Sequence, residues 1–282
     1  MLTATARLTR VALAAAGAIA LAVGTTAAGP PQAFDHTYQT YAKLLASHVH
    51  DGRVDYQRLV ADRAALVEVT SAFGAVDGAA ERAWSRDERL AFWINAYNLF
   101  TLQAIVDHYP IRAGWFTLGP RDSIRQIAGV WDRLTWRVAS RQVTLDDVEH
   151  RILRPEFKEP RIHFAVNCAS AGCPPLRNEP YRAGTLSAQL DANARSYFAS
   201  PQGVRIDGTT LVVTSILKWY GDDFVERFGS TTRAGRTPPE AAILGVVEAF
   251  GPPQAAALAR NPAVQIRFLD YDWTLNDVVR PR

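Results

Sequence analysis

Most of this 282-residue chain lacks the features that assign a protein to a function class at once. After residue 28, no apolar run approaches the roughly 20 residues that a membrane-spanning helix needs. No block of lysine and arginine suggests a nucleic-acid footprint. A glycine-rich phosphate loop and a G-x-S-x-G nucleophile elbow are also missing. We therefore expect no nucleic-acid partner, no cofactor and no stable membrane insertion once a leader is removed.

Cysteine is scarce too, and its position directs the search for a site. The two cysteines, Cys168 and Cys173, both lie in the stretch HFAVNCASAGCPPLR, which also carries His163 and two consecutive prolines. This stretch can be a thiol reaction centre, a disulfide-tied loop or a metal clamp.

The clearest signal in the sequence is its first part. Arg7 and Arg10 precede an uncharged apolar run over residues 11–23, and small residues follow it. This order is typical of a secretory signal peptide, and the run is too short to span a bilayer comfortably. Cleavage after Ala28 lowers the net charge from +3 to +1, because two arginines and no acids are removed. We predict a signal peptide over residues 1–28 and a periplasmic or secreted protein; an uncleaved membrane anchor is the alternative.

Hydrophobic periodicity predicts helices and short strands in an irregular order. The helices that we expect cover residues 34–49, 55–73, 85–109, 144–155, 185–198, 215–229 and 237–251. The strands that we expect cover residues 133–139, 161–167 and 264–273, with a hairpin over 204–213 that turns at Asp207 and Gly208. Residues 76–84 are expected to form an exposed connection.

The segment 85–109 predicts the centre of the fold. Ser85 and Glu88 form a capping box at its start, and Pro110 follows its end. Apolar residues go nearly all the way round from residue 90 onward, which marks a buried helix. We predict an α+β fold in a single domain over 34–282: a short, mainly antiparallel sheet packed by several helices around the buried central helix 90–109.

Five segments, in the same order along the chain, resemble the domain-of-unknown-function 547 family (DUF547). They are FWINAYNLFTL (92–102), TLDDVEHRILRP (144–155), RIHFAVNCASAGCPPLR (161–177), LKWYGDDF (217–224) and YDWTLND (271–277). Thr274 stands where the family more often has serine. The resemblance implies a domain without an established activity, found in secreted bacterial proteins and joined to interaction or redox modules in eukaryotic relatives.

The first hypothesis for the cysteine stretch is a thiol nucleophile. Cys168 would attack, and His163 or His150 would act as the base. Glu149 or an asparagine would orient that base, in hydrolysis or acyl transfer on a peptide-like substrate. Two features oppose this hypothesis. The prolines leave no room after Cys168 for the long helix that stabilises a thiolate, and on a continuous strand His163 and Cys168 point to opposite faces.

A disulfide and a metal site are the alternatives. Export into an oxidising compartment favours a Cys168–Cys173 bridge, which closes only if the two Cα atoms come within about 7 Å. His163 and His150 would complete a set of zinc donors, but their spacing from the cysteines matches no familiar structural-zinc pattern, so we expect no metal. With a bridge, the chain would be a non-enzymatic binding domain for a small-molecule or peptide-like ligand.

Three asparagines complete the candidate site. Asn95 and Asn98 lie one turn apart on one face of the central helix, and Asn167 directly precedes Cys168. Buried amides are costly unless they are hydrogen-bonded, so these side chains either fix loops of the fold or bind substrate. We favour the first role for Asn95 and Asn98. The choice between an enzyme and a binding domain stays open at this point.

Overall fold

The computed structural model describes residues 33–112, 119–229 and 233–278. The residues from Phe34 onward form one compact unit. The predicted signal peptide therefore lies outside the described residues. None of the helices in the described ranges has the length and apolar character needed to cross a bilayer.

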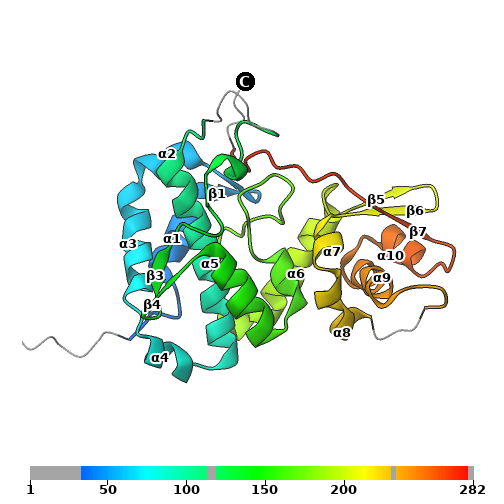
Figure 1. The fold of residues 1–282 in the computed structure, drawn as a ribbon, viewed down its shortest axis with the longest axis horizontal. Coiled ribbons are helices and arrows are strands. Elements are labelled where there is room, and N and C mark those ends of the chain that lie inside the picture. Colours follow the sequence, from blue (N-terminus) through cyan, green and yellow to red (C-terminus); the bar gives the residue numbers. More distant parts are fainter. Residues whose placement is uncertain (1–32, 113–118, 230–232, 279–282) are drawn as a thin grey trace, which may run out of the picture. The chain divides into compact units, whose positions relative to one another are not determined.

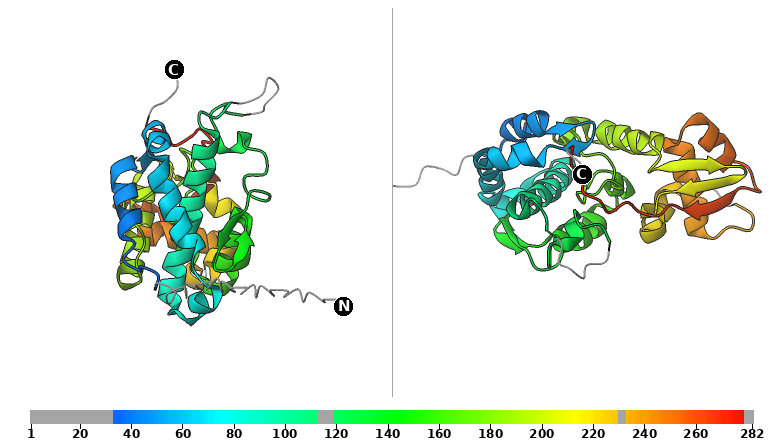
Figure 2. Two further views of the ribbon diagram at one scale, coloured as in Figure 1. Left: turned by 90° about the vertical axis from the view of Figure 1, so that its left-hand side faces the viewer. Right: turned by 90° about the horizontal axis from the view of Figure 1, so that it is seen from above.

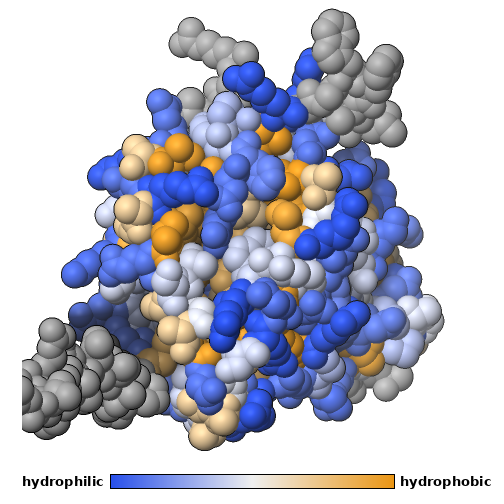
Figure 3. Space-filling model, turned by 60° about the vertical axis from the view of Figure 1, so that its left-hand side comes forward, coloured by the Kyte–Doolittle hydropathy of each residue, from blue (hydrophilic) through white to orange (hydrophobic). Residues whose placement is uncertain are grey.

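The first part of the compact unit is almost entirely helical (Figure 1, blue to green). Its helices are α1 (Gln39–His48), α2 (Tyr56–Ala61), α3 (Arg63–Gly74), α4 (Gly78–Ala83) and α5 (Arg86–His108). Two short antiparallel strands, β1 (Val49–His50) and β2 (Arg53–Val54), pair between α1 and α2. The outer face of these helices is mostly hydrophilic, with apolar residues in small separate groups (Figure 3).

The middle of the chain alternates short helices with one hairpin. Its elements are the 3-10 helix η1 (Ile124–Gln126), strands β3 (Trp136–Val138) and β4 (Arg141–Val143), the π-helix η2 (Asp147–Phe157), the 3-10 helices η3 (Pro160–Phe164) and η4 (Ala183–Thr185), and α6 (Leu186–Ala199). A π-helix is rare and occurs often at functional sites.

The last part of the chain builds a three-stranded sheet in the order β5-β6-β7. Strands β5 (Val204–Asp207) and β6 (Thr210–Val213) are antiparallel, whereas β7 (Gln265–Phe268) lies parallel to β6. The helices between β6 and β7 are α7 (Ile216–Trp219), the 3-10 helix η5 (Gly221–Phe224), α8 (Val225–Phe228), α9 (Pro238–Phe250) and α10 (Pro253–Ala259).

Helix α5 confirms the predicted central helix. The Ser85 hydroxyl accepts from the Glu88 N–H, and the Glu88 carboxylate accepts from the Ser85 N–H at 2.8 Å, which is the predicted capping box. Almost every residue from Leu90 to Val106 is buried. The described ranges thus form the expected α+β fold around this helix, with small sheets in two antiparallel pairs and one mixed set of three strands.

Two hydrophobic clusters fill the interior. The larger one surrounds α5, and the smaller one lies between α6, the three-stranded sheet and helices α7 to α9. The C-terminal segment, residues 269–278, leaves β7 and runs back to the helices of the first part (Figures 1 and 2, red). There it pairs with β2, because the Val54 N–H donates to the Asn276 carbonyl at 3.0 Å and the Val278 N–H donates to the Val54 carbonyl at 3.0 Å.

Several predicted elements were wrong in detail. The stretch 161–167 is not a strand: the Glu159 side chain caps the Arg161 N–H and Pro160 opens the turn of η3, so a 3-10 helix forms instead. Residues 76–84 are not an irregular connection, because Asp77 caps α4. The single helices expected over 55–73 and 215–229 are each divided, at Asp62 and around η5. The hairpin turns at residues 208–209, one residue later than expected.

Candidate functional site

A cavity of about 310 Å³ opens where distant parts of the chain meet. Its walls come from α5, η2, η3, the loop that follows η3, α7 and the C-terminal segment. The lining side chains are Tyr97, Trp131, Asp146, Glu149, His150, His163, Val166, Cys168, Cys173, Pro174, Ile216, Trp219, Tyr220, Tyr271 and Trp273. All four residues proposed as catalytic from the sequence, namely Cys168, His163, His150 and Glu149, therefore face one cavity, which we name the aromatic pocket.

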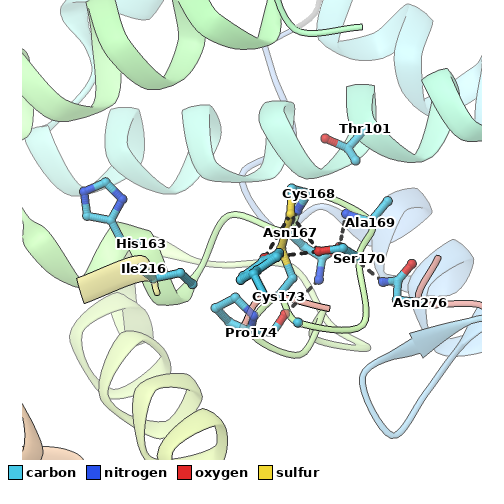
Figure 4. The surroundings of a disulfide bond; sticks show 12 residues. Thr101, His163, Asn167, Cys168, Ala169, Ser170, Cys173, Pro174, Ile216 and Asn276 are labelled. Atoms are coloured by element: carbon cyan, nitrogen blue, oxygen red, sulfur yellow. Dashed lines mark hydrogen bonds between the residues drawn. A yellow bond between two sulfur atoms is a disulfide. The ribbon is translucent and has the colours of Figure 1, made fainter. Parts of the chain in front are cut away.

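The two cysteines form a disulfide on the wall of this pocket (Figure 4). Their Cα atoms lie 6.3 Å apart, within the limit that the bridge requires. The chain turns back between them because Ala169 adopts a left-handed conformation with a φ of 57°, and its N–H donates to the Asn167 side-chain oxygen at 2.8 Å. We name residues 166–174 the cysteine loop.

The C-terminal segment holds the cysteine loop through backbone hydrogen bonds. The Ala171 N–H donates to the Thr274 carbonyl at 2.7 Å, and the Gly172 N–H donates to the Asp272 carbonyl at 2.8 Å. A Cβ atom at Gly172 would lie 2.9 Å from the backbone nitrogen of Asp272, so glycine is needed for this approach. The position of the loop therefore depends on residues about a hundred positions later in the sequence.

Aromatic side chains form one continuous wall of the pocket. The ring centroids of Tyr271 and Trp273 lie 4.6 Å apart, and the Trp219 ring lies 4.9 Å from Tyr271 and 5.9 Å from Trp273. Trp131 meets Trp273 edge-on at 6.2 Å. Because Trp219 is 47% exposed, this wall reaches from the interior to solvent.

A network of charged groups surrounds His163, one of the lining residues. His163 stacks on the Tyr220 ring at 4.0 Å, and its Nε2 donates to the Asp223 carboxylate at 2.8 Å. Arg154 binds the same carboxylate through Nε at 2.6 Å and Nη2 at 2.8 Å. Burial alone would raise the pKa of Asp223, but the hydrogen bonds from Arg154 and His163 lower it below its usual range.

The His150 ring is oriented by its neighbours on η2. Arg154 Nη1 lies 3.0 Å from His150 Nδ1, and an arginine can only donate, so this nitrogen accepts and the proton lies on Nε2. That Nε2 faces the Asp146 carboxylate at 3.8 Å. Burial raises the pKa of Asp146, and the nearby Glu149 carboxylate raises it further.

Glu149 is the buried carboxylate of the pocket, with 7% of its surface exposed. The hydroxyls of Tyr97 and Tyr220 donate hydrogen bonds to it, and burial together with its negative charge raises the pKa of both tyrosines well above the usual value. The two tyrosines therefore stay neutral and remain hydrogen-bond donors. Glu149 Oε1 lies 4.0 Å from His163 Nδ1.

The geometry around Cys168 differs from that of a cysteine–histidine pair. The polar neighbours of its sulfur are the Ser170 hydroxyl at 3.1 Å and the Tyr271 hydroxyl at 3.3 Å. His163 is bonded to Asp223 instead, and its ring lies to one side of the disulfide and is directed away from it (Figure 4). The structure thus brings the predicted catalytic residues to one pocket, but neither His150 nor His163 hydrogen-bonds to the Cys168 sulfur.

The three asparagines bond to backbone groups of the fold. Asn95 donates to the Tyr181 carbonyl at 2.8 Å and accepts from the Tyr181 N–H at 2.9 Å. Asn98 donates to the Ala165 carbonyl at 3.0 Å and accepts from the Asn167 N–H at 2.8 Å. These bonds match the loop-fixing role that we favoured for the two asparagines of the central helix.

From the sequence, we assigned the aromatic wall and Asp223 no place in the site. Trp219, Tyr220 and Asp223 lie in the motif LKWYGDDF, and Tyr271 and Trp273 lie in YDWTLND. The family resemblance rested on both motifs, so the signal was present. These aromatic residues were not counted as site residues, because tryptophans at helix or strand spacing are more often core residues.

Metal binding finds no support in the geometry. Both cysteines are in the bridge, and among the residues with described positions no group of three or more His, Cys, Asp or Glu side chains is arranged to hold a metal ion.

Comparison with known proteins agrees with the family resemblance of the sequence motifs. The sequence model of the family described as "Protein of unknown function, DUF547" matches residues 81–198, which contain α5, η2, η3 and the cysteine loop. The match supports, over these residues, the family resemblance that the motifs predicted. No curated protein and no solved structure matches it significantly. The two motifs that supply much of the aromatic wall, at 217–224 and 271–277, lie beyond the matched residues.

Proposed function

We propose that this chain is an exported binding protein whose pocket takes a small organic cation, either free or as a side chain of a peptide. The observation that carries the proposal is the composition of the pocket lining: six aromatic rings and two carboxylates, with no lysine or arginine among the lining residues that the structure describes. Aromatic faces attract cations through their quadrupoles, and the attraction grows when the site is desolvated. The carboxylates of Asp146 and Glu149 add a negative electrostatic potential that also attracts a cation.

Export is the second part of the proposal. The order of charged, apolar and small residues over 1–28 supports a signal peptide. The Cys168–Cys173 bridge supports an oxidising compartment such as the periplasm or the cell exterior.

Thiol-dependent hydrolysis is the weaker proposal for this pocket. It requires Cys168 as a free thiolate with an imidazole in reach, whereas the sulfur is bonded to Cys173 and lies next to two hydroxyls. A binding domain that presents the cysteine loop on its pocket wall agrees better with this geometry.

Choline is expected to bind at least about tenfold more tightly than 3,3-dimethylbutan-1-ol, which has the same shape without the charge. A cation over desolvated aromatic rings is worth up to about 2 kcal/mol, and about 1.4 kcal/mol corresponds to tenfold in affinity. Calorimetry and the fluorescence of the pocket tryptophans measure both affinities. Glu149→Gln should reduce the preference, and Asp207→Asn, at an exposed residue paired with Arg267, should not. Equal binding of the two compounds, or binding of a neutral oligosaccharide alone, would contradict the proposal.

The affinity for choline is expected to rise as the pH increases from about 4 towards neutrality. The pKa of Asp146 is raised from its usual 3.8, so this group is neutral at low pH and gains the charge that attracts a cation only above the raised value. Charged neighbours of Asp146 are Glu149, Asp132, Asp147 and His150. The variant Asp146→Asn isolates the contribution of this carboxylate, and its pH profile should be flatter. An identical profile would show that Asp146 takes no part.

A further inference from the structure

The disulfide on the pocket wall is surrounded by hydrogen-bond donors. The Cys168 N–H donates to the Cys173 sulfur at 2.9 Å. The Tyr271 hydroxyl approaches the Cys168 sulfur at 3.3 Å and must be the donor, because a disulfide sulfur carries no hydrogen. The Ser170 hydroxyl lies 3.1 Å from the same sulfur and donates to the Tyr271 oxygen at 3.1 Å, which leaves the Tyr271 hydrogen for the sulfur. A disulfide sulfur is a weak acceptor, whereas a thiolate is a charged and strong one. This arrangement therefore stabilises the reduced, ionised form of either cysteine more than it stabilises the bridge.

The fold holds the cysteine loop in place independently of the bridge. Beside the bonds to Thr274 and Asp272, the Asn276 N–H donates to the Ala169 carbonyl at 3.1 Å, and the Tyr197 hydroxyl donates to the Gly172 carbonyl at 2.8 Å. A bridge between residues only five positions apart also removes little chain entropy. The loop can thus keep its conformation when the bridge is open, so the bridge is available for chemistry.

The two sulfurs differ in exposure. Cys168 is partly exposed on the pocket side, whereas Cys173 is buried, with 9% of its surface exposed. An incoming nucleophile in the pocket therefore reaches Cys168 first. The sulfur that would leave in such an attack, Cys173, is the one to which the Cys168 backbone N–H donates.

We propose that Cys168–Cys173 is a redox-active pair that exchanges with low-molecular-weight thiols entering the aromatic pocket. A thiolate RS⁻ attacks the Cys168 sulfur, forming an R–S–S–Cys168 mixed disulfide, and the Cys168–Cys173 bond breaks with its electron pair passing to Cys173. A second thiolate RS⁻ attacks the R sulfur, releasing RSSR and the Cys168 thiolate, which the hydroxyls of Tyr271 and Ser170 stabilise. In this structure the Ser170 hydroxyl donates to Tyr271, so the Tyr271 hydroxyl is the direct donor to the Cys168 thiolate. Two thiols are oxidised, the bridge takes up their two electrons, and solvent supplies or receives the protons.

The first experiment equilibrates the folded protein with glutathione buffers of varied ratio, alkylates it and determines the open fraction by mass spectrometry. The open fraction should follow the buffer ratio, while circular dichroism in the aromatic region shows that the fold is kept. The variant Cys173→Ser should form a mixed disulfide with oxidised glutathione at Cys168 at least about tenfold faster than Cys168→Ser forms one at Cys173, because Cys168 is partly exposed whereas Cys173 is buried. A bridge that stays closed in excess reduced glutathione, or equal capture by the two variants, overturns the proposal.

A second experiment tests the donors themselves. Tyr271→Phe should shift the equilibrium about tenfold towards the bridge, because it removes a hydrogen bond to the thiolate. Tyr109→Phe is the matched control: it also loses a tyrosine hydroxyl bond, to Asp277 at 2.8 Å, but away from the pocket lining. A shift of the same size in both variants would overturn the role of Tyr271. These experiments do not involve choline, so they can fail while cation binding holds, and the reverse is also true.

Discussion

Replacing Glu159 with alanine is expected to lower the free energy of unfolding by about 3 kcal/mol, because it leaves the buried Arg161 guanidinium without its main partner. Arg161 donates to the Glu159 carboxylate from Nε at 2.8 Å and from Nη2 at 2.7 Å, and its side chain is 5% exposed. Arg227 of α8 binds the same carboxylate at 2.7 Å. Chemical denaturation measures the loss.

The matched control for this substitution is Glu226→Ala, one residue before Arg227 on α8. The two variants remove the same side chain, one from a buried ion pair and one from the helix surface, where substitutions usually change stability by less than about 0.5 kcal/mol. If Glu159→Ala and Glu226→Ala lower the free energy of unfolding equally, the buried ion pair stabilises the fold no more than a surface carboxylate does.

The Glu159 contribution should also depend on pH. Burial alone would raise the pKa of Glu159, but the bonds from Arg161 outweigh it, so the pKa is lowered from the usual 4.5. A carboxyl whose folded pKa lies below its unfolded pKa stabilises the protein above the unfolded value. This stabilisation is therefore present at neutral pH and is lost as the pH falls below about 4.5, and Glu159→Gln should show a shallower loss in acid.

Replacing Asn167 with alanine is expected to lower the free energy of unfolding by about 3 kcal/mol and to abolish ligand binding in the aromatic pocket. The Asn167 amide donates to the Pro174 carbonyl at 2.7 Å, and its oxygen accepts from the Ala169 N–H at 2.8 Å and from the Asn276 amide at 3.2 Å. Alanine would leave these buried groups unpaired, at about 1–3 kcal/mol for each. The cysteine loop would lose its internal support.

Asn261→Ala provides the control for Asn167. Its side-chain oxygen also accepts from the N–H two residues later, at 2.9 Å, but at an exposed turn before β7. That variant should lose less than about 1 kcal/mol. Denaturation and choline titration are measured on both variants. If Asn167→Ala weakens choline binding with unchanged stability, the residue contacts the ligand instead of supporting the loop.

Local sequence determined the helices because the residues that cap a helix and those that set its apolar pattern lie within a few positions of each other. The capping box of Ser85 and Glu88, followed by an all-round apolar run, predicted α5. In the structure, Thr237 and Glu240 form a capping box at the start of α9 as well. Asn95 and Asn98 were recognisable as buried amides that need partners. The partners themselves, the backbones of Tyr181 and residues 165–167, follow only from the fold.

The stretch 161–167 shows where local patterns fail. Alternating apolar residues predicted a strand, but almost every side chain from Pro160 to Asn167 is buried, so the alternation does not separate an inner from an outer face. Periodicity cannot distinguish a strand from another element that is buried on all sides. The Glu159 cap and the restricted backbone of Pro160 favour a 3-10 helix here.

By itself, the sequence determined the resemblance to the family, the α+β class, the central helix and the group of residues from Glu149 to Cys173 that faces the pocket. Only the tertiary structure decided what surrounds that group. The C-terminal segment returns from β7 to β2 and brings Tyr271 and Trp273 against the cysteine loop, while η3 turns His163 towards Asp223 and away from the sulfur. These contacts join residues 60 to more than 100 positions apart, and such distances are set by packing, which no local pattern records.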